Sequence, residues 1–265
     1  MTKHPGQRPR AATFRFYAEL NDFLPAHLAA EEICYRFAGT PSVKDAIEAQ
    51  GIPHTEVELV LANGAPVDFH HRLCDGDRIA VYPVFESFDI TPLVRLRESP
   101  LRHPRFVSDA NLGKLARWFR LLGFDTLYSN QYPDAELASL ACRECRTVLT
   151  RDRQLLHHKA ITHGYWVRSD KPDEQVIEVL QRFQLERCVK PFSRCLDCNG
   201  RIHPVPKSSV SGSLEPGTRA HHDTFFQCSQ CHRVYWRGSH YERMLARLER
   251  VLDSAAARSE PRLTV

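Results

Sequence analysis

The feature of this sequence that most constrains its fold is a set of four cysteines, arranged as two pairs near the C-terminus. Two residues separate Cys195 from Cys198, two separate Cys228 from Cys231, and a longer polar stretch lies between the pairs. Four thiolates at this spacing can surround one zinc ion, so a short segment can fold without a large core. Because four sulfurs leave no position for water, the spacing predicts a structural zinc ribbon over residues 189–241.

The composition favours a globular protein with about two domains. The 265 residues are 42% hydrophobic, which is enough for packed cores. No apolar run approaches the roughly 18 residues that cross a bilayer, and no apolar segment follows the basic N-terminal residues to make a signal peptide. Nine cysteines, an odd number, fit a reducing compartment better than a disulfide scaffold. We therefore expect a cytoplasmic protein without a membrane partner, and the net charge of +4 permits nucleic acid as a partner.

Residues 13–90 carry the pattern of a ubiquitin-like, or β-grasp, domain. Strand patterns at residues 14–16 and 31–37 precede a short helix that Ser42 is expected to cap. Two further strand patterns follow, and the first leads into a turn at Asn63-Gly64. This order, with the later turn at Asp75-Gly76-Asp77, resembles the sulfur-carrier branch of the β-grasp fold, whose members are similar to the small subunit of molybdopterin synthase.

Sulfur-carrier chemistry is not expected of this domain. The resemblance implies a free C-terminal Gly-Gly, whereas the corresponding stretch here is Val84-Phe85-Glu86-Ser87 and the chain continues. We therefore predict a binding or scaffolding module that can recruit a protein partner. Residues 1–12 are predicted to be a disordered tail, and residues 91–104, which mix proline with arginine, are predicted to be a linker.

Residues 105–188 alternate between strand and helix patterns. Strands are predicted at 105–108, 125–128, 147–150 and 165–168, and helices at 112–122, 134–145, from 153, and at 173–183. This alternation predicts a parallel α/β sheet whose ligands bind beyond the carboxyl ends of the strands. No glycine-rich phosphate loop follows any of these strands, which argues against a dinucleotide or nucleoside triphosphate site.

Acidic residues follow the predicted strands. Because the carboxyl ends of parallel strands meet at one edge of a sheet, we expect these side chains to converge. Carboxylates that repel one another coexist when Mg²⁺ or Mn²⁺ neutralises them, and such ions activate water for phosphodiester hydrolysis. Any one of these residues alone is more often a helix cap, but the recurrence at every strand end favours metal-dependent nuclease chemistry. The four are Asp109, Asp134, Asp152 and Asp170, with Glu136 and Asp173 as alternatives to the second and fourth.

Several separated motifs resemble those of one ribonuclease family. Four motifs occur in the family's order along the chain. They are the string from Phe106 to Asp125, the segment Leu149–Arg153, the first cysteine pair with the Asn-Gly that follows it, and the closing segment 235–241. Together they are similar to the PIN-like ribonuclease domain named after the C-terminal part of the Mut-seven exonuclease. The resemblance extends from Arg105 to about Met244, and family members with an N-terminal ubiquitin-like extension resemble the chain from Thr13 onward.

This resemblance implies a metal-dependent ribonuclease. Its acidic positions are matched by Asp109, Asp134, Asp152 and Asp170. The hypothesis is RNA hydrolysis by water that Mg²⁺ or Mn²⁺ activates, leaving 5′-phosphate and 3′-hydroxyl ends. Asp109 and Asp152 are the expected central ligands, and the other two complete the metal site or orient the water.

Basic residues beside these carboxylates are predicted to contact RNA phosphates, although a solvated helix face is an equal alternative. They are Lys114, Arg117 and Arg120, spaced along helix 112–122, together with Arg151 and Arg153. In the ribbon, Tyr235 and Trp236 either stack on nucleic acid or pack the small core, and core packing is favoured for Trp236. Residues 242–265 are expected to form a helix to Leu252 and then a disordered tail.

Two other functions stay open. One is a non-catalytic RNA- or ribosome-binding adaptor, which would bind RNA in a salt-sensitive manner without needing divalent cations. The other is a partner-recruiting protein that acts through the β-grasp module. The sequence makes no prediction of the oligomeric state.

Overall fold

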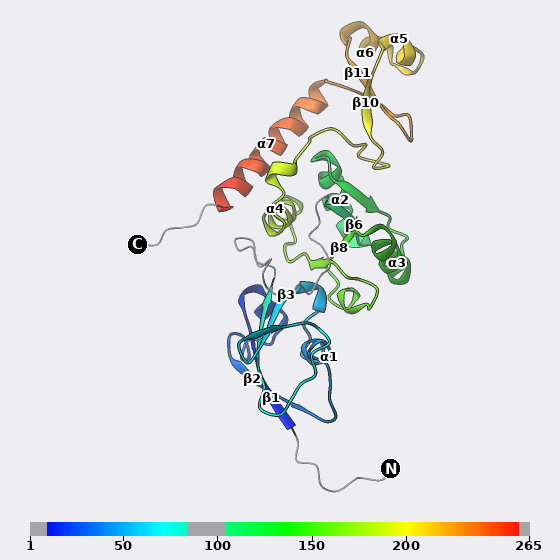
Figure 1. Ribbon diagram of the computed structural model, residues 1–265. Coiled ribbons are helices and arrows are strands. Elements are labelled where there is room, and N and C mark those ends of the chain that lie inside the picture. Colours follow the sequence, from blue (N-terminus) through cyan, green and yellow to red (C-terminus); the bar gives the residue numbers. More distant parts are fainter. Residues whose placement is uncertain (1–9, 84–103, 260–265) are drawn as a thin grey trace. The chain divides into compact units, whose positions relative to one another are not determined.

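The structure is a computed structural model that describes residues 10–83 and 104–259 (Figure 1). Residues 91–103 of the predicted linker 91–104 and residues 1–9 of the predicted tail 1–12 lie outside the described residues, whereas residues 10–12 of that tail belong to the first strand. The described chain forms two compact units. One contains residues 10–83 and 152–166, and the other contains residues 104–151 and 167–259.

The first unit has the predicted β-grasp fold. A five-stranded sheet has the order β2-β1-β5-β3-β4, in which β1 and β5 are parallel and the other pairs antiparallel. The short strand β4, at the far side of the Asn63-Gly64 turn, was not predicted. The elements are β1 (Arg10–Phe16), η1 (Ala18–Phe23), β2 (Glu32–Phe37), α1 (Val43–Ala49), η2 (His54–Glu56), β3 (Val57–Ala62), β4 (Ala65–Val67) and β5 (Arg78–Pro83).

Local sequence explains why α1 begins where it does. The Ser42 hydroxyl accepts a hydrogen bond from the Asp45 N–H (3.1 Å), and the Asp45 carboxylate accepts one from the Ser42 N–H (3.3 Å). This reciprocal capping box satisfies two backbone donors at the start of the helix, and it confirms the predicted cap. The helix then buries Val43, Ala46 and Ile47 in the core of the sheet.

Residues 152–166 pack on this unit, although the sequence placed them in domain 105–188. They form η4 (Leu155–His157) and β9 (Gly164–Trp166). The carbonyl of Ile161 lies 3.0 Å from His54 Nε2, and the Trp166 N–H donates to Glu56 Oε1 at 2.7 Å. The Trp166 ring packs against the β-grasp core and lies 5.2 Å from the ring of Phe23. Burial of this apolar surface explains why the segment belongs to the first unit.

The second unit contains the predicted parallel sheet. Strands β6 (Arg105–Ser108), β7 (Asp125–Tyr128) and β8 (Thr147–Thr150) pair in the order β7-β6-β8, and both pairings are parallel. Helix α2 packs against β6, β7 and α4, while α3 packs against β6 and β8. The predicted mixed α/β fold class is therefore confirmed. The helices are η3 (Ala110–Leu112), α2 (Gly113–Leu121), α3 (Asp134–Glu144), α4 (Pro172–Arg182) and η5 (Glu186–Cys188).

The ribbon and a long helix complete this unit. The ribbon is an antiparallel sheet of β10 (Ile202–Val205), β11 (Phe225–Cys228) and β12 (Val234–Trp236), in that order. Its polar excursion folds as α5 (Lys207–Val210), η6 (Ser211–Ser213) and α6 (Pro216–His221).

Helix α7 (Ser239–Ser259) packs along α4 (Figure 1). The sequence predicted that the helix ends at Leu252, and this was wrong. Val251 and Ala255 are buried, and Gln181 of α4 donates a hydrogen bond to the Ala255 carbonyl at 3.1 Å. Packing on α4 therefore extends the helix beyond the predicted end. Within the two described ranges, no helix combines the length and the apolar character that a bilayer span requires.

Candidate functional site

Asp109 lies at the carboxyl end of the parallel sheet, where the sequence placed it. Its backbone N–H donates to the Leu149 carbonyl (3.0 Å), which continues the pairing of β6 with β8. One carboxylate oxygen accepts a hydrogen bond from the Thr150 hydroxyl (3.0 Å) and the other from the Ala110 N–H (2.5 Å). Two donors from separate elements thus fix the orientation of this half-buried carboxylate at the edge of the sheet.

The other three predicted carboxylates have different surroundings. Asp152 belongs to the first unit, where it accepts a hydrogen bond from the Gln154 N–H at 2.8 Å. Asp134 is exposed in the first turn of α3. The Asp170 side chain is 80% exposed and pairs with Arg151. Of the residues that the structure describes, only the four cysteines form a group of three or more potential metal ligands.

The structure also places the two alternative ligands. Glu136 is exposed in the first turn of α3. Asp173 makes a two-pronged ion pair with Arg247 of α7, at 2.7 and 3.3 Å. Asp173 therefore attaches α4 to α7.

A basic cavity of about 660 Å³ opens beside the helix that follows Asp109. Tyr128 lines it, and the Tyr128 hydroxyl donates to the Ala110 carbonyl at 3.0 Å. The close approach of Tyr128 to the backbone explains Gly113, because a Cβ there would lie 2.5 Å from the Tyr128 hydroxyl oxygen. The cavity is lined by Asn111, Gly113, Lys114, Arg117, Arg120, Tyr128, Arg151, Asp170, Pro172, Gln175, Leu196 and Asp197.

Three of the five predicted RNA-binding side chains can present charge to this cavity. Lys114 and Arg117 are exposed on α2, and Arg151 is exposed after β8. Arg120 has another role, since it is 4% exposed and donates hydrogen bonds to the carbonyls of Thr126 (2.9 Å), Leu196 (3.0 Å) and Asp197 (2.6 Å). It therefore binds the first cysteine turn of the ribbon to α2.

Arg153, the fifth predicted RNA contact, lies in the first unit. Its guanidinium stacks 3.8 Å from the ring centre of Trp166 and 5.3 Å from that of Phe23. It also donates to the Asp22 carbonyl at 3.2 Å. These contacts hold the segment that follows β8 on the β-grasp unit, which is a structural role.

The four cysteines meet as the sequence predicted. Their ligand atoms all lie within 4.8 Å of one another, with 3.6 Å between Cys195 and Cys231 and 3.4 Å between Cys198 and Cys228. A Zn–S bond of about 2.3 Å places the sulfurs of a tetrahedron roughly 3.8 Å apart. The observed separations therefore fit a tetrahedral metal.

Matching backbone turns build the two halves of this centre. Asn199 and His232 each follow a cysteine pair with positive φ, 68° and 58°. Their N–H groups donate to the carbonyls of Cys195 (3.0 Å) and Cys228 (3.1 Å), respectively. Gly200 is required for space, because a Cβ there would lie 2.7 Å from the Cys228 sulfur.

The thiols do not all ionise easily without a cation. Burial raises the pKa of Cys195, but hydrogen bonds from the Cys198 N–H and the Tyr235 hydroxyl outweigh it and bring the pKa to about 6. Burial and the adjacent Cys228 thiol raise the pKa of Cys198 to about 12. Since metal ligation requires thiolates, a bound cation must supply the charge that stabilises the full set.

A polar network centred on Asp125 was missed from the sequence. The Asp125 carboxylate accepts hydrogen bonds from Arg146 and Asn199, both at 2.8 Å, and Arg194 lies 3.4 Å away. Asn199 in turn accepts the Thr126 N–H at 3.1 Å. The network joins β7 to the first cysteine turn. The feature of the sequence that could have indicated this network is the polar pair Asn199-Gly200 directly after the first cysteine pair.

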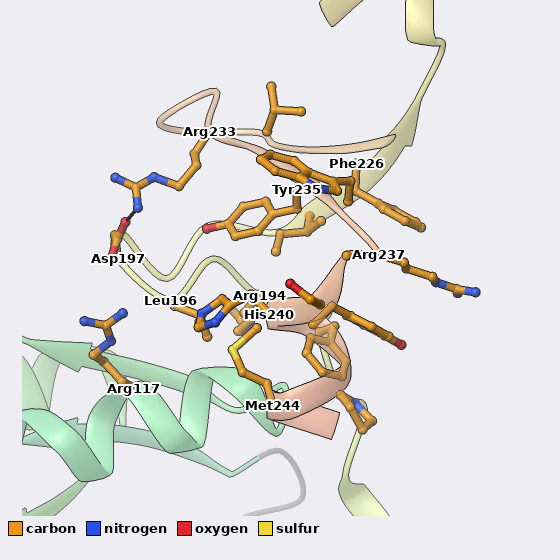
Figure 2. A pocket seen from close by; sticks show the side chains of 18 residues that line it. Arg117, Arg194, Leu196, Asp197, Phe226, Arg233, Tyr235, Arg237, His240 and Met244 are labelled. Atoms are coloured by element: carbon orange, nitrogen blue, oxygen red, sulfur yellow. Dashed lines mark ion pairs between the residues drawn. The ribbon is translucent and has the colours of Figure 1, made fainter. Parts of the chain in front are cut away.

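A second hollow, the ribbon groove, lies between β12, the start of α7, residues 191–197 and Arg117 of α2, and its volume is about 490 Å³ (Figure 2). Trp236 lines it and is 38% exposed, so the expectation that Trp236 packs the ribbon core was wrong. The hydroxyl of Tyr235 instead reaches the metal centre, 3.0 Å from the Cys195 sulfur. The two adjacent aromatic residues therefore have different roles.

Comparison with protein families gives matches to two parts of the chain. Residues 104–248, more than half of the sequence, match the Mut7-C RNAse domain. Residues 10–89 match the Mut7-C ubiquitin domain. The order of the two matches is the one that the sequence motifs predicted. No curated protein and no solved structure was found to match the chain.

Proposed function

This chain belongs to the Mut7-C RNAse domain family, and we propose that it is a ribonuclease that hydrolyses RNA phosphodiester bonds with Mg²⁺ or Mn²⁺. The observation that carries the proposal is the basic cavity beside Asp109. The oriented Asp109 carboxylate lies at the carboxyl end of the parallel sheet, the edge where α/β proteins bind ligands, and Asn111, two residues further along the chain, lines the cationic cavity.

Asp109 and Asp152 are the proposed ligands of the catalytic metal. Mg²⁺ keeps several water molecules and is commonly bound by one or two carboxylates together with substrate phosphate, so a dedicated cluster of carboxylates is not needed. Asp109 fits this pattern, because Thr150 and the Ala110 N–H hold an oxygen donor at the edge of the sheet. When bound, the metal would lower the pKa of a water molecule and polarise the phosphate.

The chain's own residues would position the RNA. Lys114, Arg117 and Arg151 present cationic groups to the cavity and would bind phosphate oxygens. Asp170 pairs with Arg151, and we propose that an incoming phosphate takes the place of Asp170 on this arginine. Asp134 is proposed to orient a water molecule bound to the metal. The expected products carry 5′-phosphate and 3′-hydroxyl ends.

The cysteine centre is proposed to hold one structural zinc ion. Four sulfur donors close the coordination sphere, so no position is left for a reacting water. The ion would fix the two cysteine turns and, through Asn199, the start of β7.

The test is digestion of structured and single-stranded RNA by the full chain while Mg²⁺ or Mn²⁺ is titrated. Asp109→Asn should lower the rate at least about 100-fold, the scale typical for loss of one group that stabilises a transition state. Asp152→Asn should do the same, and Asp134→Asn and Asp170→Asn should lower the rate less. Asp253→Asn, an exposed carboxylate of α7, is the matched control. Cleavage that survives the Asp109→Asn, Asp152→Asn double variant would refute the proposal. RNA binding without cation-dependent cleavage would favour an adaptor.

A further inference from the structure

The ribbon groove combines aromatic rings with cationic side chains. Phe226, Tyr235 and Trp236 line it from the ribbon, and Tyr241 lines it from the first turn of α7. Trp236 is the large hydrophobic side chain that stands out as exposed in the described part of the chain. The Arg237 guanidinium lies 6.0 Å from the ring centre of Phe226 and 5.8 Å from that of Tyr241. The groove therefore offers flat apolar surfaces edged by positive charge.

The charge of the groove is strongly one-sided. Arg117, Arg233 and Arg237 line it together with His240. Asp197 is the one carboxylate among the described residues that line it, and it is already paired with Arg233, as the dashed line in Figure 2 shows. An occupant that complements this surface must carry negative charge as well as a flat apolar face.

The ribbon groove continues into the basic cavity. Arg117, Leu196 and Asp197 line both hollows, so the two meet at this point of the surface. In Figure 2, Arg117 projects from α2 just below Asp197. A chain-like ligand with regularly spaced negative charges could thus follow one path from the aromatic end at Trp236 to the cationic end at Lys114 and Arg151.

We infer that the ribbon groove binds an unpaired stretch of RNA, with a base stacked on Trp236 and phosphates on Arg237 and Arg117. This inference rests on the proposed ribonuclease function and gives its substrate as RNA with a single-stranded segment. Aromatic stacking with a flanking cationic track is how proteins hold single strands. In a duplex the bases are stacked within the helix and cannot reach a side chain in this way, so a fully paired RNA does not fit.

The test is the affinity of the full chain for an unpaired oligouridylate without added Mg²⁺ or Mn²⁺. Under these conditions binding is measured apart from cleavage. Trp236→Ala should raise the Kd about 5- to 150-fold, the loss expected from one stacked base. Trp236→Phe retains a ring and should keep most of the affinity. Zinc content, measured on each variant, shows that the ribbon is intact.

One further ligand and the salt dependence of binding separate stacking from charge. With an oligonucleotide whose bases are replaced by abasic sites, the wild type and Trp236→Ala should bind equally, whereas Arg237→Ala should weaken binding. Arg237→Ala should also reduce the slope of log affinity against log salt by about 0.7, the value for one phosphate contact on a single strand. Arg219→Ala removes an exposed arginine of α6 outside the groove and should change neither quantity.

Three results would overturn the inference. The first is an unchanged Kd of Trp236→Ala for oligouridylate, or a loss of affinity for the abasic oligonucleotide as large as the loss for oligouridylate. The second is failure of the wild type to bind unpaired RNA. The third is that an acidic, aromatic-rich peptide occupies the groove while RNA does not. If the protein binds unpaired RNA as described but does not cleave it, only the proposed ribonuclease function fails. If the protein cleaves RNA and Trp236→Ala binds RNA as tightly as the wild type, only the assignment of the groove fails.

Discussion

Replacing Arg146 by methionine should destabilise the second unit strongly, because Arg146 is a buried cation at the centre of a satisfied network. It is 4% exposed, and its guanidinium donates to the Asp125 carboxylate (2.8 Å), to Glu144 (2.9 Å) and to the carbonyl of Phe106 (3.1 Å). Methionine has similar length and keeps the apolar contacts of the side chain. The variant therefore tests the loss of charge and hydrogen bonds rather than the creation of a cavity.

The size of the loss in stability depends on the groups that still surround Asp125 after Arg146 is replaced. Removing one partner of a buried ion pair costs about 3–5 kcal/mol, since the other charge stays buried without compensation. Asn199, the half-buried Arg194 and Arg105, whose Nε lies 3.6 Å from the carboxylate, still face Asp125 in the variant. We therefore expect about 3 kcal/mol, the lower end of that range.

The loss should depend on pH in a defined direction. Burial alone raises the pKa of Asp125, but hydrogen bonds from Arg146 and Asn199 outweigh it and hold the pKa below its ordinary value. A group whose pKa is lower in the folded state stabilises the fold above its unfolded pKa, about 3.9 for aspartate. This stabilisation disappears as the pH falls through the folded-state pKa. The difference between wild type and Arg146→Met should thus be complete at pH 7 and shrink below about pH 4.

The assay is urea unfolding of the full chain at pH 7 and at about pH 3, below the unfolded pKa of aspartate. Arg143→Met is the matched control, since its side chain is 66% exposed and pairs with Glu144 at 3.7 Å, and it should change the free energy of unfolding by less than about 0.5 kcal/mol. A loss below about 1 kcal/mol in Arg146→Met at pH 7, or a loss that grows in acid, would refute the reasoning.

Three further predictions concern the close packing around Gly123, the zinc site, and the segment 152–166 that packs on the β-grasp unit. Gly123→Ala should cost roughly 1–3 kcal/mol in thermal unfolding, because its φ is +94° and a Cβ would lie 2.3 Å from a backbone carbonyl, while Gly212→Ala, with open space around it, should be nearly neutral. Cys198→Ser should lower the zinc content measured by elemental analysis and expose the ribbon to protease, and full retention of zinc would contradict the assignment of four cysteine ligands. Arg153→Ala should speed amide exchange in residues 155–166, as expected for a cation–π contact of about 1 kcal/mol, whereas the exposed Lys159→Ala should not.

Sequence reasoning succeeded where local spacing determines the structure. Two cysteine pairs are enough to predict a tetrahedral centre, and Ser42 with Asp45 is enough to predict the start of α1. It also placed Asp109 correctly, because a residue directly after a strand cannot move far from the strand's end. Asp134 lies further from its strand, beyond a loop after Tyr128, so the sequence could not determine where its side chain points.

The sequence was least informative for side chains whose partners are distant in the chain. Helical periodicity put Arg120 on an exposed stripe, but the carbonyls of Leu196 and Asp197 reach it from the ribbon and bury it. Trp236 showed the opposite error, since a large apolar residue in a small domain is usually buried. Here Tyr235 occupies the inward position beside Cys195, and the neighbouring strand residue Trp236 faces outward, as alternation along a strand requires.

The β-grasp domain holds part of its own chain, and this changes how its function must be tested. The segment that begins with Asp152 is bound to it by the His54 ring, the Glu56 carboxylate and the stack of Arg153 on Phe23. Deleting residues 1–90 would expose the apolar surface of Trp166 and release the segment that follows a proposed metal ligand. Loss of cleavage after such a deletion would therefore follow even if no partner protein exists. A partner-docking role is tested instead by charge reversal on the exposed strand β2, for example Arg36→Glu, which leaves the contacts to residues 152–166 in place. If this variant loses a binding partner but still cleaves RNA, the domain both docks a partner and holds the segment, whereas retention of every partner would leave only the second role.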